Sequence, residues 1–266
     1  MGLYIEAQGE GPGLVLLHGW GLHGGIWAPV AGALARHYRL YRVDLPGHGH
    51  SPLTSDFTLE GVMAEVLEAV PARAHWLGWS LGGLVALGAA VRHPARVDRL
   101  VLVASAPRFS RAADWPRGMA IARLDAFADE LERDYRGTLM RFLSLQTRGA
   151  DHEREDLRVL RAALFERGRP ALEALRGGLR MLREVDLRGE IARIDLPALW
   201  LAGAHDRLVH PDALRAAAAL GGGRFEVVRG AGHAPFLSHP EAFVRRVHAF
   251  LAAGSGGPLG ADSPGR

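Results

Sequence analysis

The sequence predicts an α/β fold, with a mostly parallel sheet, helices on both of its faces and a helical insertion. Short apolar runs alternate with helix-length segments up to about residue 106 and again from about residue 191, and this alternation is typical of a parallel sheet covered on both faces. Between the two regions only helical stretches occur. We therefore expect an α/β core of residues 1–106 and 191–252, a helical cap of residues 107–190, and a disordered Gly/Pro/Ser-rich tail of residues 253–266.

The expected elements follow from apolar runs bounded by turn residues and from helical periodicity. Strands are expected at 14–17, 40–43, 74–79, 97–104, 196–202 and 224–228. Core helices are expected at 26–37, 58–69, 81–92, 211–220 and 240–252, and cap helices at 115–135, 136–147, 153–167 and 169–184. Thr58 is placed to cap the helix that follows it.

Composition excludes several functional classes. The chain has 266 residues, is 48% hydrophobic and carries a net charge of +3. Although all 32 basic residues are arginine, no basic run interleaved with aromatic residues suggests a nucleic-acid partner. No apolar stretch is long enough to cross a membrane, and the first residues do not read as a signal peptide. We expect a cytoplasmic monomer that binds neither membrane nor nucleic acid.

Redox and metal chemistry find little support in the sequence. The chain has no cysteine, which excludes disulfides and thiolate ligands, and its 13 histidines show no metal-ligand spacing. The nearest histidine pair, His48 and His50, lies in a Gly-rich turn and is read as scaffold. We expect no metal and no organic cofactor.

The most informative stretch is Gly78-Trp79-Ser80-Leu81-Gly82, between an expected strand and an expected helix. Gly-x-Ser-x-Gly at such a junction is the nucleophile-elbow pattern. The flanking glycines let strand and helix approach closely enough to hold the serine at the tip of a strained turn. Ser80 is therefore the candidate nucleophile.

A serine nucleophile needs a base and an acid, which in this kind of fold follow it in the order acid, then histidine. His233, in a loop after the last expected strand, is the candidate base, and His239 at the start of the final helix is its rival. Asp206, a few residues beyond the preceding strand, is the candidate acid. Its rival Asp212 follows Pro211 and is expected in the first turn of a helix.

The developing oxyanion requires backbone donors from two directions. The N–H of Leu81 is expected to supply one, because it opens the helix after Ser80. The N–H of Trp20, in the His18-Gly19-Trp20 turn after the first expected strand, is expected to supply the other. The Trp20 indole could also form a wall of the substrate pocket.

These motifs resemble those of the α/β-hydrolase superfamily over about residues 3–252. The shared segments are L-L-H-G-W, D-L-P-G-H-G-H-S, G-W-S-L-G-G, G-A-H-D and G-A-G-H-A-P-F. The resemblance implies a hydrolase with a Ser80–His233–Asp206 triad. D-L-P-G-x-G-x-S is architectural in many members, so Asp44 is read as scaffold with His48 and His50.

A closer resemblance is to the pimeloyl-acyl-carrier-protein methyl ester esterases of biotin synthesis. It is carried by L-L-H-G-W-G-L, W-L-G-W-S-L-G-G-L-V-A, R-F-L-S-L-Q-T in the cap, and the later R-G-G-L and V-D-L-R segments. It implies hydrolysis of the methyl ester of a pimeloyl chain held on acyl carrier protein. By position, it implies substrate contacts from Trp20, Ser80, Leu81, Phe142, Leu143, Ser144, Leu145, Gln146 and His233.

The cap has an arginine-rich part that could receive an acidic carrier protein. Residues 136–183 contain eleven arginines against six acidic residues, and Arg154, Arg158 and Arg161 share one helical face. Together with Arg141 they are the candidate docking residues. The alternative is an ordinary solvated face, partly neutralised by neighbouring acids.

Two other functions remain open. The same triad could serve a broad small-ester carboxylesterase or a carbon–carbon bond hydrolase with another cap. A non-catalytic ligand receptor on a hydrolase scaffold is the second alternative, since a fold alone does not fix a function. Ser80 excludes the dehalogenases of the superfamily, which place an aspartate at the elbow.

Overall fold

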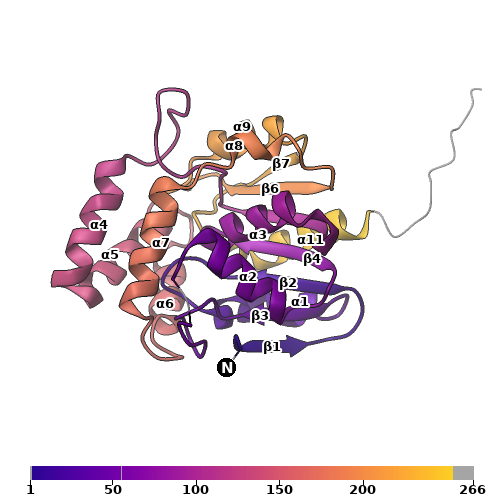
Figure 1. The fold of residues 1–266 in the computed structure, drawn as a ribbon, viewed down its shortest axis with the longest axis horizontal. Coiled ribbons are helices and arrows are strands. Elements are labelled where there is room, and N and C mark those ends of the chain that lie inside the picture. The colour runs from indigo at the N-terminus through magenta and orange to yellow at the C-terminus, as the bar shows by residue number, and fades with distance from the viewer. Residues whose placement is uncertain (1, 55, 254–266) are drawn as a thin grey trace, which may run out of the picture.

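The computed structural model describes residues 2–54 and 56–253 of the chain, whose centre is a seven-stranded sheet (Figure 1). The strands are β1 (Ile5–Gln8), β2 (Gly13–Leu17), β3 (Arg39–Val43), β4 (Ala74–Trp79), β5 (Val97–Val103), β6 (Ala198–Gly203) and β7 (Arg224–Val228). They lie in the order β1-β3-β2-β4-β5-β6-β7, and all pairs are parallel except β1 with β3. The expected mostly parallel α/β sheet is confirmed.

Helices cover both faces of the sheet. They are α1 (Ala28–Leu34), α2 (Leu59–Ala69), α3 (Leu81–Arg92), α4 (Ile121–Arg133), α5 (Tyr135–Thr147), α6 (Glu153–Ala163), α7 (Leu172–Glu184), α8 (Arg188–Ile191), α9 (Pro211–Leu220), α10 (Pro235–Ser238) and α11 (Pro240–Ala252), with short 3-10 turns at Gly24–Trp27 and Pro94–Arg96. Helices α2 and α3 pack together, as do α1, α10 and α11, and α9 packs on β6 and β7. None of the helices in the described ranges is long and apolar enough to cross a membrane.

The sheet interior is almost wholly apolar. Leu14, Leu16, Trp76, Leu77 and the helix α3 side chains next to them are shielded from solvent. Because a parallel strand is covered on both faces, such strands read as continuous apolar runs rather than as alternating patterns. This is why the central strands could be located from sequence.

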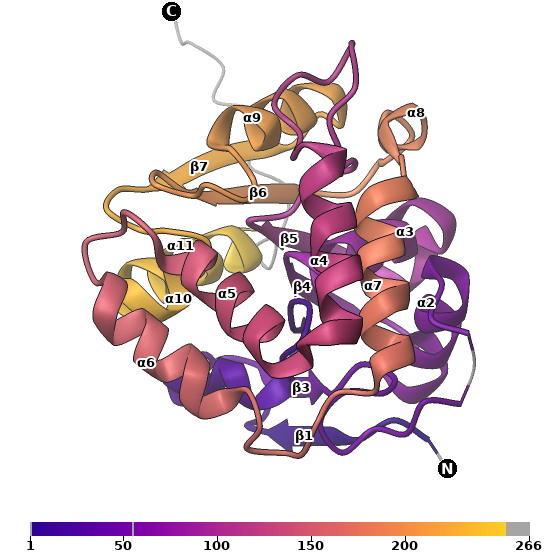
Figure 2. The same ribbon diagram turned by 90° about the vertical axis from the view of Figure 1, so that its left-hand side faces the viewer.

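Helices α4 to α7, here called the cap helices, lie between β5 and β6 in the chain. They gather beside the carboxyl ends of the parallel strands, at the left of Figure 1 and in front in Figure 2. In α/β sheets this edge is where ligands bind. The cap helices therefore cover the edge at which the elbow, acid and histidine loops emerge.

The expected boundaries hold closely in the core and less well in the cap. Thr58 caps α2 by accepting from the Gly61 N–H at 3.1 Å, as predicted. The predicted helix over 115–135 was wrong at its start, because α4 begins at Ile121 and an irregular segment with a Ser110–Met119 bridge precedes it. Similarly, α6 ends at Ala163 and α7 begins at Leu172. The predicted disordered tail of residues 253–266 lies, apart from Ala253, outside the described residues.

Candidate active site

Ser80 occupies a strained turn between β4 and α3. Its φ of 53° and ψ of −118° fall in a region that non-glycine residues rarely adopt. A Cβ on Gly78 would collide with the Gly82 carbonyl, and one on Gly82 would collide with the backbone of β2. The glycines of the motif are thus required by the close approach of strand and helix.

The backbone on both sides of Ser80 is held in place. Its N–H donates to the Val103 carbonyl at 2.9 Å, and its own carbonyl accepts from the Ser105 hydroxyl at 2.8 Å. The carbonyl also accepts from the N–H groups of Gly83 and Leu84, which starts α3. The turn is therefore fixed by β5 and by the helix rather than by its own local preference.

Asp206 and His233 form a buried pair. Asp206 Oδ2 lies 2.8 Å from His233 Nδ1, and both side chains are almost completely shielded from solvent. The other carboxylate oxygen accepts from the N–H groups of Leu208 and Val209 at 2.8 and 3.0 Å. The rival residues lie apart from this pair: Asp212 is in the first turn of α9 and bonds Arg117, and His239 N-caps α11.

Trp79 links the elbow to the histidine loop. Its indole N–H donates to the His233 carbonyl at 2.8 Å, and the two rings lie 5.7 Å apart. The His233 N–H in turn donates to the Gln146 carbonyl of α5 at 3.0 Å. The His233 backbone is therefore held from both the core and the cap. The role of Trp79, adjacent to Ser80, could not be read from the sequence motif.

His233 Nε2 is buried and has no hydrogen-bond partner among the described residues. The structure thus joins Asp206 to His233 but forms no hydrogen bond from His233 to Ser80. A buried imidazole nitrogen without a partner costs stability, and a catalytic role is one reason for a protein to keep such a group. Catalytic hydrogen bonds are often long or misaligned before substrate binds.

Trp20 and Leu81, the expected oxyanion residues, lie next to one another. A Cβ on Gly178 of α7 would lie 2.6 Å from Trp20 Cδ1 and 3.2 Å from Leu81 Cδ2, so both side chains pack on the same glycine. The Trp20 indole N–H donates to the Leu175 carbonyl of α7 at 2.8 Å. The Leu81 N–H is the first of α3 and has no acceptor within the helix.

The side chains of the predicted substrate segment on α5, residues 142–146, face different surroundings. The Phe142 ring packs edge-on against Trp20 at 4.7 Å, and Leu143 and Gln146 are also buried. Ser144 and Leu145 are half-buried and line a cavity instead. Of this segment, Phe142 thus contacts the expected oxyanion residue Trp20, and the Gln146 carbonyl contacts His233.

That cavity, here called the cap pocket, has a volume of about 660 Å³ and lies among α4, α5 and α6. Its lining is Arg123, Ala126, Phe127, Glu130, Met140, Arg141, Ser144, Leu145, Arg148, Glu153 and Arg161. Neither Ser80 nor His233 lines it, and Ser80 is only 4% exposed. Phe127, which does line it, packs on Phe142 at 5.5 Å. Two aromatic rings therefore separate the cap pocket from Trp20.

The candidate docking arginines divide into two kinds. Arg154, Arg158 and Arg161 are exposed on α6 and form no ion pair with any described residue. Arg141 is paired with Glu130 and Asp134, at 2.9 and 3.3 Å. The three α6 residues are therefore the freer cations. Arg123 and Arg148, which were not among the predicted docking residues, line the cap pocket together with Arg161.

Asp44, His48 and His50 lie in the loop after β3. Asp44 is fully buried, and its carboxylate accepts from the N–H groups of Gly24 and His50 and from Arg167. This is a structural role, consistent with the scaffold interpretation. In the described part of the chain, no group of three or more His, Asp or Glu side chains is arranged to hold a metal ion.

Comparison with known proteins identifies the class. The model of the alpha/beta hydrolase family matches residues 14–246, and the chain belongs to this family. A pimeloyl-[acyl-carrier protein] methyl ester esterase of Xanthomonas campestris pv. campestris (strain B100) is 48% identical over 253 residues, which are 94% of this chain and 99% of the relative. The protein of the same name from Stenotrophomonas maltophilia (strain R551-3) is 46% identical over 256 residues, covering 94% and 96%.

Solved structures agree on the fold. The enol-lactonase from Burkholderia xenovorans LB400 superposes with a TM-score of 0.82 at 27% identity, covering 94% of this chain and 96% of that one. The esterase EaEST from Exiguobacterium antarcticum gives 0.83 at 23% identity, covering 94% and 95%, and supports the fold alone.

Proposed function

We propose that this protein is a serine esterase that removes the methyl group from a pimeloyl chain carried on acyl carrier protein. The observation that carries the proposal is near-full-length identity of 46–48% to esterases named for that substrate. The strained Ser80 and the buried Asp206–His233 pair supply the parts that such a reaction needs.

The reaction has two halves. Ser80 Oγ attacks the ester carbonyl carbon while His233 Nε2 takes the hydroxyl proton, and the oxyanion is held by the N–H groups of Trp20 and Leu81. Collapse of this intermediate breaks the bond to methoxide, which receives the proton from His233 and leaves as methanol. Water then attacks the acyl-enzyme with His233 as base, which releases the carrier-bound acid and restores Ser80.

The cap pocket supports an entry route for the carried chain. Its lining includes the apolar side chains of Phe127, Met140 and Leu145, which suit a methylene chain, and several arginines. On this route the chain would pass the Phe127–Phe142 pair, because Ser80 is buried and does not line the cap pocket. Exposed Arg154, Arg158 and Arg161 would then receive the acidic carrier.

The first experiment measures methanol release from methyl-pimeloyl acyl carrier protein and from free dimethyl pimelate, with wild type and Ser80→Ala. We expect strong preference for the carrier-bound ester and no activity in the variant. Equal, slow turnover of both esters with fast cleavage of short aryl esters would make the protein a general carboxylesterase. No Ser80-dependent hydrolysis of any ester would favour a binding protein.

Docking is tested by reversing Arg154, Arg158 and Arg161 together to Glu. We expect kcat/KM for the carrier-bound ester to fall at least about tenfold, with dimethyl pimelate unchanged. The matched control reverses Arg36, Arg193 and Arg245, which are exposed outside the cap helices and change the net charge equally. Equal losses in both triple variants would reject a docking face on α6.

A further inference from the structure

His18 stands between the loop after β3 and the turn that carries Trp20. Its ring is fully buried and makes two hydrogen bonds. The Leu45 N–H donates to Nε2 at 2.9 Å, and Nδ1 lies 2.8 Å from the Gly19 carbonyl oxygen. Because a backbone N–H can only donate, Nε2 must accept, and the proton of the neutral ring is on Nδ1. His18 Nδ1–H therefore donates to Gly19.

The Gly19 carbonyl belongs to the same peptide unit as the Trp20 N–H. In a trans peptide these two groups point in opposite directions. The carbonyl is held by His18 and also accepts from the Leu22 N–H at 3.3 Å. With the carbonyl fixed on one side, the Trp20 N–H is fixed on the other.

Gly19 also lies directly against the elbow. A Cβ at this position would lie 3.3 Å from Ser80 Cβ and 3.0 Å from the Trp79 ring. The Trp20 peptide is thus next to the nucleophile, and a small rotation of that peptide would change where its N–H points. An oxyanion donor is effective only when it is aimed before the reaction begins.

We propose that His18 is a positioning residue for ester hydrolysis, whose Nδ1–H holds the Gly19 carbonyl and thereby aims the Trp20 N–H at the developing oxyanion. The inference rests on the proposed esterase function and adds a residue to it. His18 itself does not touch the substrate.

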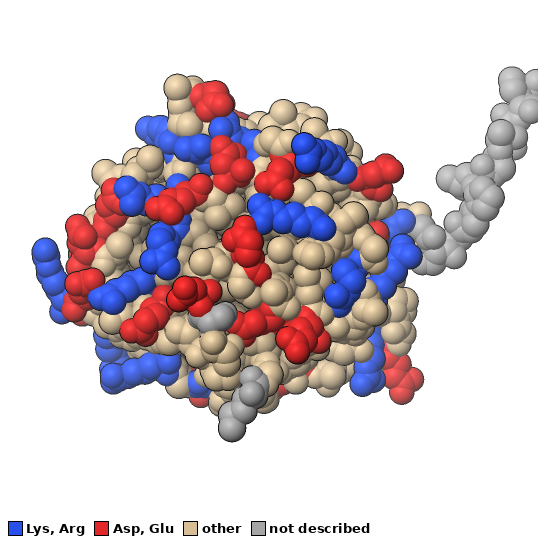
Figure 3. Space-filling model, viewed as in Figure 1, with Lys and Arg blue, Asp and Glu red and all other residues tan. Residues whose placement is uncertain are grey.

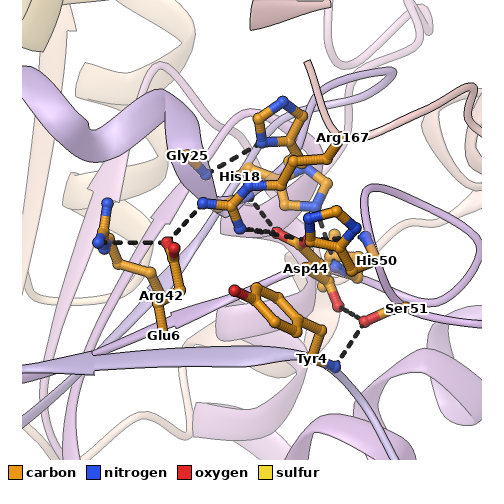
Figure 4. A network of polar contacts seen from close by, with 12 residues as sticks. Tyr4, Glu6, His18, Gly25, Arg42, Asp44, His50, Ser51 and Arg167 are labelled. Carbon is orange, nitrogen blue, oxygen red and sulfur yellow. Dashed lines mark hydrogen bonds and ion pairs between the residues drawn. The ribbon is translucent and has the colours of Figure 1, made fainter. Parts of the chain in front are cut away.

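The surroundings keep His18 in the required state. Burial, followed by the nearby His48, lowers its pKa well below the ordinary value, so the ring stays neutral. The donor on its other side is equally fixed, because Leu45 follows Asp44, whose carboxylate is bound by Gly24, His50 and Arg167. Figure 4 shows His18 beside this network. A series of contacts therefore connects Arg167, in the linker between α6 and α7, through residues 44 and 45 to the turn that carries Trp20.

Two substitutions separate the two hydrogen bonds of His18. In His18→Asn the amide nitrogen can occupy the place of Nδ1 and keep the bond to Gly19, but it loses the acceptor for Leu45. In His18→Gln the amide oxygen can occupy the place of Nε2 and keep Leu45, but it loses the donor to Gly19. His48→Gln is the control, because His48 is also a fully buried histidine, packs on His18 and bonds Pro46 rather than Gly19.

The measurements are kcat and KM for a Ser80-dependent ester, the Kd of an arylboronic acid that forms a tetrahedral adduct on Ser80, and Tm. We expect His18→Gln to lower kcat by about 10- to 100-fold with little change in KM, and to weaken boronate binding in parallel. His18→Asn should recover at least about a third of the wild-type kcat, and His48→Gln should keep it.

A purely structural role predicts another pattern. Equal losses in His18→Asn and His18→Gln, or losses that follow Tm in all three variants, would overturn the inference. Hydrolysis of aryl esters without hydrolysis of the carrier-bound ester would reject the proposed substrate. The three variants would then be compared on the aryl ester, and the inference about His18 would still be tested. Absence of any Ser80-dependent hydrolysis in wild type would overturn both.

Discussion

Asp206 uses its two carboxylate oxygens for different partners. Oδ1 accepts from two backbone N–H groups, of Leu208 and Val209, and Oδ2 faces His233 Nδ1. Since a backbone N–H cannot accept, the side of the group that faces residues 208 and 209 must stay an acceptor. The loop after β6 therefore decides which atom of residue 206 faces the imidazole.

This asymmetry makes Asp206→Asn a sharp test of the triad. The amide oxygen should remain on the Leu208 and Val209 N–H groups, which turns the amide NH₂ toward His233 and forces Nδ1 to accept. Nε2 then carries the proton and cannot take one from Ser80. We expect kcat to fall about 10⁴-fold with little change in Tm. Asp212→Asn, at the half-buried rival position, should change kcat less than about twofold, and comparable losses in both variants would reject the assignment.

Asp156, on α6, gives the cap a pH dependence. Burial raises its pKa to about 6, and the neighbouring Glu155 acts in the same direction while His152 opposes it. A raised carboxyl pKa means that the folded state binds the proton more tightly than the unfolded state. This group therefore contributes stability at low pH that is lost as the pH rises through about 4 to 6.

Asp156→Asn should remove that loss. As the pH is raised from about 4.5 to about 7.5, the free energy of unfolding of the variant should increase relative to that of wild type by at least about 1 kcal/mol. This corresponds to about 2–4 °C in Tm. Urea unfolding and thermal melts at the two pH values measure it. Glu155→Gln removes an exposed acid from the same turn whose charge is only a minor cause of the Asp156 shift, so it should show a much smaller growth with pH. A constant difference between Asp156→Asn and wild type would contradict the prediction.

Single motifs predicted some residues of the site and not others. Ser80, Asp206 and His233 could be found because each stands in a short pattern at the end of an expected strand. Trp79 and Arg167 could not, since their roles depend on contacts with residues more than a hundred positions away. Sequence spacing does not contain such contacts.

The linker between α6 and α7 fastens the cap to the core. From it Arg167, which is mostly buried, binds the fully buried Asp44 and also Glu6 of β1, and its guanidinium lies 5.3 Å from the Tyr4 ring centre (Figure 4). Burial alone would raise the pKa of Glu6, but the Arg167 hydrogen bond and the charge of Arg42 lower it overall. One cap side chain thus neutralises two core carboxylates.

Arg167→Met should therefore destabilise the protein far more than loss of a surface arginine. Removing one partner leaves the Asp44 carboxylate buried and uncompensated, for which we expect about 3 kcal/mol in the free energy of unfolding. Urea unfolding followed by tryptophan fluorescence provides the measurement. Arg169→Met, exposed in the same linker, should cost less than about 0.5 kcal/mol. Similar values for the two variants would mean that the Arg167 network does not fasten the cap.

Among the strands and helices, the deeply buried ones were the easiest to locate from the sequence. Strands β2, β4 and β5 and helix α3 are covered on all sides, so their apolar runs stand out. The short antiparallel β1 was missed because it lies at the sheet edge and is half exposed, which leaves little apolar signal. The start of α4 was misplaced because Pro116 and Gly118 belong to an irregular segment held by backbone bonds to residues 109–112.

The whole molecule keeps the candidate triad shielded from solvent and most of its charged side chains at the surface. Ser80, Asp206 and His233 are all buried. Over the face shown in Figure 3, arginines and acidic residues are interspersed, and many of the arginines in the described structure are ion-paired. Arg154, Arg158 and Arg161 are among the described arginines that form no ion pair, and they share one exposed face of α6. A field from unpaired charges acts on a large acidic partner but hardly on a small neutral ester.

Ionic strength should therefore separate the two substrates of the proposed esterase. Salt screens exposed charges over about 10 Å at 0.1 M, so raising NaCl from about 50 to 500 mM should lower kcat/KM for the carrier-bound ester about tenfold. Turnover of dimethyl pimelate should change less than about twofold, because the substrate is neutral and the candidate triad is buried. In the Arg154, Arg158 and Arg161 reversal variant, the salt dependence should vanish or change sign, since screening then weakens a repulsion. A parallel decline for both substrates would place the effect of salt on the fold or on the cap helices, and not on carrier docking.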